Sequence, residues 1–280
     1  MTVPRNVGVL GGGTMGAGIA HSFLTAGANV VVVERDPISV DAARKRIFQG
    51  LEKAAKFEPL NLDEILSRTA FSTDFEAFRS AELVIEAVPE DPSLKSEALS
   101  KVERELSDSA WLTTNTSSLS ISELSRALRR PDRFCGLHFF NPVPRSRLVE
   151  IVSTEKTRAE LVQEAKAWVS ALGKTPIVVQ DAPGFASSRL GVALALEAMR
   201  MLEENVASAK DIDAAMVLGY KHAAGPLLTT DLVGLDVRLQ IAEYLASTLG
   251  PRFAPPQILR DKVSRGELGK KTGKGFFTYE

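Results

Sequence analysis

A glycine-rich turn near the start of the chain constrains the fold more than any other feature. The turn Gly11-Gly12-Gly13-Thr14-Met15-Gly16 fits the spacing G-x-G-x-x-G, and the residues on either side matter more than the match itself. An apolar, strand-like run from Val7 to Leu10 precedes the turn, and Ala17 to Ala26 continue it as a helix. A strand, a glycine turn and a helix in this order are typical of the first crossover unit of a dinucleotide-binding sheet.

Each glycine of the turn has a separate reason to be there. Gly11 permits a tight turn, Gly13 lets the backbone approach a pyrophosphate, and Gly16 allows the helix to pack closely on the strand. The helix N-terminus then faces the negative charge of the ligand. We therefore expect these three glycines to bind a cofactor, together with Thr14 and Met15 between them.

The second strand-like run ends in an acidic residue, Glu34. Its distance from the glycines is close to that of the acid which binds a ribose 2′-hydroxyl in such folds. The Glu34 carboxylate would repel a 2′-phosphate, whereas Arg35 beside it could accommodate one. We expect NAD as the cofactor, with NADP as the alternative.

Strand-like runs alternate with helical patterns from Val7 to Val179, which is typical of a doubly wound, mostly parallel α/β sheet of the Rossmann type. The expected strands are Val7 to Leu10, Val30 to Glu34, Leu83 to Glu86, Trp111 to Asn115, Phe134 to Phe139, Val149 to Val152 and Ile177 to Val179. Between the second and third of these, residues 40–67 are rich in Ala, Lys and Glu and are broken by Pro59. This stretch predicts a helical hairpin that stands off the sheet.

The character of the chain changes after Asp181-Ala182-Pro183-Gly184, where strand-like runs stop. We expect residues 1–182 to form the cofactor-binding domain and residues 183–280 to form a smaller, all-helical domain. In its first helix one apolar stripe is expected, formed by Leu190, Leu194, Ala198, Met201 and Leu202. That stripe would serve the core of the domain or an oligomer interface.

Composition excludes several classes of protein. The charges of the 34 Lys and Arg nearly cancel those of the 35 Asp and Glu, so the composition does not predict a large basic surface. A nucleic acid partner is therefore not expected. No apolar run reaches membrane-spanning length, and Met1 to Arg5 carry no signal pattern. The single cysteine, Cys135, excludes an intrachain disulfide and suits a reducing compartment, so we expect a cytoplasmic protein. No further ligands cluster with Cys135, so we expect no metal site and read it as a small buried residue.

Oxidation of an alcohol also needs a base for the hydroxyl proton, and histidine is the commonest one. Of the three histidines, His21 is expected to pack in the first helix and His222 to be a surface or packing residue. His138 instead ends a strand at the carboxyl edge, where ligands collect in such sheets. Glu150, 12 positions later, could orient the imidazole from the next strand. Taken by itself, a histidine in a strand is more often structural than catalytic.

Several segments resemble the 3-hydroxyacyl-CoA dehydrogenase family in order and spacing. They are Asn115 to Ile121, Gly136 to Pro144, which includes His-Phe-Phe-Asn-Pro, and Leu148 to Glu150. Further matches are Glu86-Ala87-Val88, Pro183-Gly184-Phe185, Asp231 to Asp236 and Lys271 to Phe276. The resemblance covers almost the whole chain, and the His-Phe-Phe-Asn-Pro segment is its most specific part.

The resemblance implies catalytic roles. His138 is implied as the general base, Glu150 as the carboxylate that orients it, and Ser117 as the hydrogen-bond donor to the 3-oxygen of the substrate. The segment containing Ser117 also reads as a helix start, with Ser120 and Glu123 spaced as a capping box. Both uses are compatible in one segment.

Four further residues are implied as cofactor contacts. Asn141, Glu90 and Lys95 match family positions that line the nicotinamide and ribose, and Asn115 matches a residue beside the cofactor. The alternative from the residues alone is that Glu90 and Lys95 form an ordinary solvated pair near a helix start.

The chain departs from the family pattern at two places. Where the family carries a substrate-contacting Asn after Pro-Gly-Phe, this chain has Ser188. We expect Ser188 to bind substrate in a weaker form, or only to cap or pack its helix. The helical hairpin, in which the family carries a lysine that contacts CoA, is shorter than usual in this chain. Lys53 and Lys56 are the candidates for that contact, and the alternative is that both are exposed surface charges.

The resemblance therefore implies reversible oxidation of a short L-3-hydroxyacyl-CoA, such as 3-hydroxybutyryl-CoA, by a homodimer that associates through its helical domain. One alternative is a dehydrogenase of a hydroxy acid without CoA, of the gulonate or carnitine type. Another is a structural protein like the lens crystallin with this fold, which would bind NAD without turnover. The presence of both His138 and Glu150 argues against a purely structural role.

Overall fold

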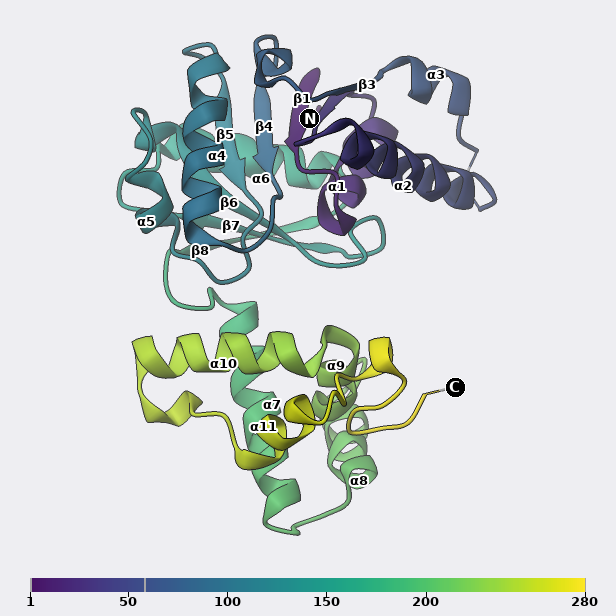
Figure 1. The fold of residues 1–280 in the computed structure, drawn as a ribbon, viewed down its shortest axis with the longest axis vertical. Helices are drawn as coiled ribbons and strands as arrows, with labels where there is room; N and C mark the ends of the chain where they lie inside the picture. The colour runs from purple at the N-terminus through teal and green to yellow at the C-terminus, as the bar shows by residue number, and fades with distance from the viewer. Residues whose placement is uncertain (1, 58, 280) are drawn as a thin grey trace. The chain divides into compact units, whose positions relative to one another are not determined.

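The computed structural model describes residues 2–57 and 59–279. These residues form two compact units, which divide between Asp181 and Ala182 (Figure 1). Each unit has its own hydrophobic core. None of the described helices is long and apolar enough to cross a membrane.

The first unit is built on one sheet of eight strands in the order β3-β2-β1-β4-β5-β6-β7-β8. The strands are β1 (Asn6–Leu10), β2 (Asn29–Val33), β3 (Thr69–Ser72), β4 (Leu83–Glu86), β5 (Trp111–Thr114), β6 (Phe134–Phe139), β7 (Leu148–Ser153) and β8 (Thr175–Gln180). All neighbouring strands are parallel except β6 and β7, which are antiparallel. The doubly wound, mostly parallel sheet expected from the sequence is confirmed.

Helices cover both faces of this sheet. They are α1 (Thr14–Thr25), α2 (Pro37–Ala55), α3 (Leu62–Ser67), α4 (Pro92–Glu105), α5 (Ile121–Ser125) and α6 (Ala159–Ala171), with 3₁₀ turns at Phe75–Phe78 and Pro131–Arg133. Helices α1, α2 and α6 share one core with alternate residues of the central strands. Helix α4 lies on the opposite face, in front of β4 and β5 in Figure 1.

Two expectations for this unit are wrong. Strand β3 was not expected, because only one residue of Thr-Ala-Phe-Ser is strongly apolar, and pairing with the edge of β2 is what makes it a strand. The helical hairpin does not stand off the sheet. Helix α2 begins at Pro37, where the Asp36 carboxylate accepts from the Ser39 amide at 2.7 Å, and contacts α1, β2 and β3. Its residues Ala43, Ile47 and Leu51 belong to the main core.

The second unit is helical, as expected. It consists of α7 (Ser187–Glu203), α8 (Ala209–Ala214), a π-helical turn at Ala215–Gly219, α9 (Pro226–Val233), α10 (Leu235–Leu249) and α11 (Gln257–Ser264), with 3₁₀ turns at Pro251–Phe253 and Lys270–Thr272. Two isolated bridges tie its last residues together, Gly269 to Lys274 and Lys274 to Thr278. The Asp231 carboxylate of α9 accepts hydrogen bonds from the amides of Phe276 and Phe277, both at 2.8 Å, which anchors the end of the chain.

The buried face of α7 differs from the expected stripe. Leu190 is 71% exposed, whereas the sequence predicts that it shares an apolar stripe with Leu194, Ala198, Met201 and Leu202. The core of the unit is instead built on the adjacent face of the helix, whose buried residues are Val192, Ala195, Leu196, Ala198 and Met199. The two faces overlap at Ala198, because both follow helical spacing on one apolar sequence.

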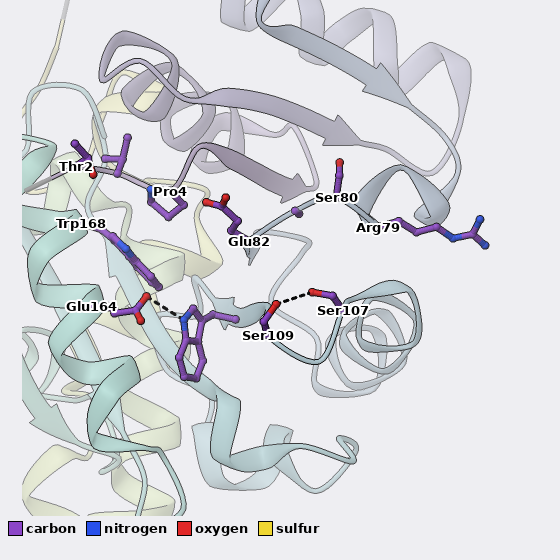
Figure 2. A pocket seen from close by; sticks show the side chains of 12 residues that line it. Thr2, Pro4, Arg79, Ser80, Glu82, Ser107, Ser109, Glu164 and Trp168 are labelled. Carbon is purple, nitrogen blue, oxygen red and sulfur yellow. Dashed lines mark hydrogen bonds between the residues drawn. The ribbon is translucent and has the colours of Figure 1, made fainter.

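A cavity of about 550 Å³ lies at the amino edge of the sheet, beside the starts of β1, β4 and β5 (Figure 2). Some of its polar side chains hydrogen-bond to one another. The Trp111 indole donates to the Glu164 carboxylate at 3.1 Å, and the hydroxyls of Ser107 and Ser109 lie 3.2 Å apart. Because ligands of such sheets bind at the carboxyl edge, this cavity is not the candidate site.

Candidate active site

The glycine turn between β1 and α1 has the shape that a dinucleotide needs. Gly11 has a φ of +90°, which favours glycine, and a Cβ on Gly16 would lie only 1.8 Å from the Gly11 carbonyl oxygen. A Cβ on Gly13 would meet nothing within 4 Å, so one side of the turn is open. Thr14 and Met15 begin α1, whose N-cap makes no side-chain hydrogen bond. The residues present therefore fit a pyrophosphate at the helix N-terminus.

Glu34, directly after β2, reaches the same turn. Its Oε1 atom accepts a hydrogen bond from the Gly12 amide at 2.7 Å, and its Oε2 atom accepts from the Arg35 amide at 3.2 Å. The Arg35 side chain is 84% exposed and pairs with Asp36 at 3.0 Å. The carboxylate of Glu34 therefore lies at the turn, while the Arg35 guanidinium is held by a neighbour on the surface.

His138 and Glu150 face each other across the antiparallel pair β6 and β7. They are register partners, and the His138 Nδ1 atom lies 2.7 Å from Glu150 Oε2. Glu150 is fully buried and His138 is 4% exposed. Since β6 ends one residue after His138, the imidazole is held at the carboxyl edge of the sheet. A carboxylate in this position orients the ring and stabilises its protonated form.

Asn115 joins the neighbouring strand to this pair. Asn115 follows β5 directly and is buried, and its Oδ1 atom accepts from the Phe139 amide at 2.8 Å. The ring of Phe140 packs on the His138 ring, with 4.4 Å between the ring centres. Asn115 therefore fixes the end of β6, and this is a structural task that its match to the family did not indicate.

Glu90 holds the segment that contains Ser117. Its Oε1 atom accepts from the Thr116 hydroxyl at 2.5 Å and from the amides of Ser117 and Ser118 at 2.9 and 3.2 Å. Burial raises the pKa of Glu90, but the Lys95 ammonium and these three donors outweigh burial, so the pKa lies below its ordinary value. Within the described part of the chain the Ser117 hydroxyl makes no hydrogen bond, so it is available to a ligand.

Lys95 is buried, so the alternative of a solvated pair with Glu90 is wrong. Only 1% of the Lys95 side chain is exposed, and its ammonium lies 2.8 Å from Glu86, 3.1 Å from the Val88 carbonyl oxygen and 3.4 Å from Glu90. Glu86 is fully buried at the end of β4, where it also accepts from the Val88 amide at 2.6 Å and from the Thr114 hydroxyl. Lys95 thus donates two hydrogen bonds, to Glu86 and to the Val88 carbonyl oxygen, and forms a second, longer ion pair with Glu90.

Glu86 is the residue of this site that sequence reasoning missed. The signal was present, because an acidic residue ends the otherwise apolar run Leu83 to Glu86 and a lysine follows nine positions later. A carboxylate at the end of a buried strand needs a cation or several donors nearby.

The remaining candidates take no part in the hydrogen bonds described above. Asn141 is exposed, two residues after the end of β6, and Lys53 and Lys56 are exposed at the end of α2. Ser188 lies in the first turn of α7, in the second unit.

Three side chains for which the sequence predicts no part in the site lie where it predicts them. Cys135 is fully buried, and burial raises the pKa of its thiol to about 12, which makes it inert at neutral pH. His21 is buried in α1, and His222 is exposed.

Comparison with known proteins agrees with this geometry. Residues 6–182 match the family described as 3-hydroxyacyl-CoA dehydrogenase, NAD binding domain, and residues 184–279 match its C-terminal domain. The chain is 40% identical to a 3-hydroxybutyryl-CoA dehydrogenase of Mycobacterium tuberculosis over 98% of each chain. It is 38% identical to the mitochondrial hydroxyacyl-coenzyme A dehydrogenase of Sus scrofa, over 99% of this chain and 91% of that one.

Solved structures agree as well. The crystal structure of (S)-3-hydroxybutyryl-CoA dehydrogenase from Ralstonia eutropha superposes with a TM-score of 0.94 at 36% identity, covering 99% of both chains. Matches of this extent run through both units. The chain therefore belongs to the 3-hydroxyacyl-CoA dehydrogenase family and is an NAD-dependent oxidoreductase.

Proposed function

We propose that this enzyme oxidises the 3-hydroxyl of a short L-3-hydroxyacyl-CoA, such as 3-hydroxybutyryl-CoA, and reduces the 3-ketoacyl-CoA in the reverse direction. The observation that carries the proposal is the buried His138 and Glu150 pair at the carboxyl edge, with Nδ1 and Oε2 2.7 Å apart. The relatives named 3-hydroxybutyryl-CoA dehydrogenase support the short acyl chain.

The chemistry divides between cofactor and protein. NAD, when bound, supplies the acceptor for the hydride that leaves C3 of the substrate. Because Nδ1 of His138 faces Glu150, we assign removal of the hydroxyl proton to the other ring nitrogen, Nε2. The imidazolium that results is stabilised by the Glu150 carboxylate, which itself stays ionised.

Ser117 completes the machinery by donating its hydroxyl to the 3-oxygen, where negative charge develops in the reduction direction. Glu90 holds its backbone through the Ser117 amide at 2.9 Å, and Lys95 holds Glu90. Lys95 is therefore proposed as a positioning residue. The contacts of Glu90, Asn115 and Asn141 with nicotinamide or ribose, and any such contact of Lys95 beside its ion pairs, remain proposals from the family resemblance.

One assay tests the function against its alternatives. Acetoacetyl-CoA with NADH should be turned over rapidly, and free keto acids of the same length should be turned over poorly. Preference for a free keto acid would favour an enzyme of the gulonate or carnitine type. Binding of NADH without turnover of any of these substrates would favour a structural role like that of the lens crystallin.

The cofactor preference depends on Glu34. Replacing Glu34 with Ala should weaken NADH binding by about 10-fold to 100-fold, the usual range for hydrogen bonds to a charged group, and should narrow the gap to NADPH. Titration of both cofactors measures this. Arg35→Ala serves as the matched control and should leave NADH affinity unchanged. A native preference for NADPH would contradict the role of Glu34.

Ser188 is proposed to assist in binding the substrate oxygen. Its hydroxyl would donate directly or through a water, in place of the Asn that the family carries. Ser188→Ala should lower kcat by about tenfold, because Ser117 and His138 still hold the same oxygen, and Ser188→Asn should stay active. Full kcat and unaltered KM for acetoacetyl-CoA in Ser188→Ala would mean that Ser188 only caps or packs α7.

We also propose a cytoplasmic homodimer that associates through the helical unit, which would also complete the substrate cleft. Exposed apolar side chains of that unit support the interface, among them Leu190 at 71%, Leu232 at 54% and Val233 at 44%. Sedimentation at micromolar concentration should show a dimer. A monomer under these conditions would reject the proposal.

A further inference from the structure

A second pocket lies within the helical unit. Its volume is about 280 Å³, and it lies between α7, the segment before α9, α9 itself and α10. The lining residues are Leu190, Gly191, Leu194, His222, Ala224, Pro226, Thr229 and Arg238. Most of this lining is apolar, and Arg238 supplies its one guanidinium. None of these residues has a role in the catalytic mechanism above, and Leu190 is also one of the exposed apolar side chains proposed for the subunit interface.

Among the residues that the structure describes, the buried Arg238 side chain has no counter-ion. Arg238 is 7% exposed, and no group in the described residues accepts a hydrogen bond from its Nε atom. Its two terminal nitrogens lie beside Gly191, at 3.5 and 3.9 Å from where a Cβ of that residue would be. No ion pair joins Arg238 to any acid that the structure describes in this unit.

The nearby acids have other partners. Asp213 accepts from the amides of Leu227 and Leu228 at 2.9 and 2.8 Å. Asp231 accepts from the end of the chain, including the Tyr279 hydroxyl at 2.8 Å, and Asp236 pairs with Lys271 at 2.6 Å. The buried Arg238 charge is therefore not neutralised by any acid among the described residues of the helical unit. Such a group is uncommon in folded proteins and calls for an explanation.

We propose that this pocket binds a carboxylate at the end of a short alkyl chain, with the Arg238 guanidinium as its counter-ion. A guanidinium presents parallel N–H groups that match the two oxygens of a carboxylate. Leu194, Ala224 and Pro226 would contact the alkyl chain, and the Thr229 hydroxyl offers a further hydrogen bond. The proposal rests on the helical unit alone and not on the proposed substrate.

The charge balance favours a carboxylate over a phosphate. Burial lowers the pKa of Arg238 to about 10, so the group still carries its charge at neutral pH. One cation compensates one negative charge, and the only other ionisable group in the lining is the exposed imidazole of His222. A phosphate near neutral pH carries up to two charges and would need a second cation.

Calorimetric titration of the full-length protein tests the proposal. Butanoate and hexanoate should bind, with hexanoate the tighter ligand, and 1-butanol should not. Arg238→Met, which has similar volume and no charge, should lose at least tenfold in affinity for both acids. The matched control is Arg260→Met, which removes a surface cation of the same unit that pairs with Glu243 at 2.5 Å. That control should bind both acids normally.

Thermal unfolding separates loss of binding from loss of folding. Arg238→Met should melt at or above the native temperature, because it removes a buried charge without a partner. Arg238→Lys keeps the charge and should retain weaker binding. Glutaryl-CoA, titrated in parallel, distinguishes a carboxylate carried on a CoA thioester from a free acid, and an Arg238-dependent signal with either source supports the site.

Three results would overturn the proposal. They are the absence of binding by butanoate, hexanoate and glutaryl-CoA, equal affinity in the native protein and Arg238→Met, and a lower melting temperature of Arg238→Met with altered sedimentation. The last result would mean that Arg238 pairs with a carboxylate of a second copy of the chain.

Discussion

His138→Gln is expected to lower kcat for acetoacetyl-CoA reduction by about 10²-fold to 10⁴-fold, the usual contribution of a general acid or base. Glutamine keeps much of the shape of the side chain but cannot exchange the proton that the 3-oxygen gains or loses. The affinity for NADH should stay unchanged, because the group acts on the substrate. Steady-state kinetics and a separate NADH titration measure the two quantities independently.

Replacement of Glu150, the partner of His138, should lower kcat less than replacement of His138 itself. Glu150→Gln is expected to lose a smaller part of kcat, since Glu150 acts through the imidazole at a distance of 2.7 Å and does not touch the substrate. His222→Gln is the matched control, because His222 is exposed and has no proposed role in the reaction. Near-normal turnover in His138→Gln would reject the mechanism and leave the His138 and Glu150 pair as a structural feature of the sheet.

Lys95→Met is expected to lower the free energy of unfolding by about 3–5 kcal/mol, as the removal of one member of a buried ion pair commonly does. The substitution leaves Glu86 fully buried without its cation, and it also removes the ammonium 3.4 Å from Glu90. Urea unfolding measures the loss. Where the variant folds, kcat should also fall, because Glu90 then holds the Ser117 segment less firmly.

The same helix offers a matched control. Lys101 of α4 is 49% exposed and pairs with Glu97 at 2.6 Å, and such surface pairs contribute about 0–1 kcal/mol. Lys101→Met should therefore unfold almost as the native protein does, with normal kcat. Replacing Glu86 with Gln in the Lys95→Met background should recover part of the loss by removing the unpaired charge. Equal stability of Lys95→Met and Lys101→Met would contradict the buried network.

Local features of the sequence were enough to predict most strands of the sheet. Strand β6 begins and ends where its apolar pattern does, and the other expected strands differ from the observed ones by at most two residues at either end. Short β-branched runs that alternate with helical patterns encode this order locally. The glycine turn could also be predicted from local sequence. The positive φ of Gly11 and the close approach of Gly16 to the Gly11 carbonyl oxygen each require glycine.

The errors in the first unit share one cause. Strand β3 and the position of α2 depend on what lies beside them, since β3 pairs with β2 and Ala43, Ile47 and Leu51 pack into the main core. The sequence around Phe71 is polar and that of the hairpin is charged. Neither pattern shows which neighbouring strand or helix each segment will pack against. Tertiary packing overrides weak local preference in such segments.

The candidate site divides in the same way. The sequence by itself determined which residue types are present at the carboxyl edge, because strand ends and the segments after them can be located from local pattern. It placed His138 and Glu150 on neighbouring strands, but only the antiparallel register made them direct partners. Lys95 looked like a solvated charge near a helix start, and only the tertiary structure revealed that Glu86, from the preceding strand, lies 2.8 Å from its ammonium. The physical reason is that periodicity encodes which face of an element is apolar, whereas burial and pairing of a charge depend on atoms brought close by the fold.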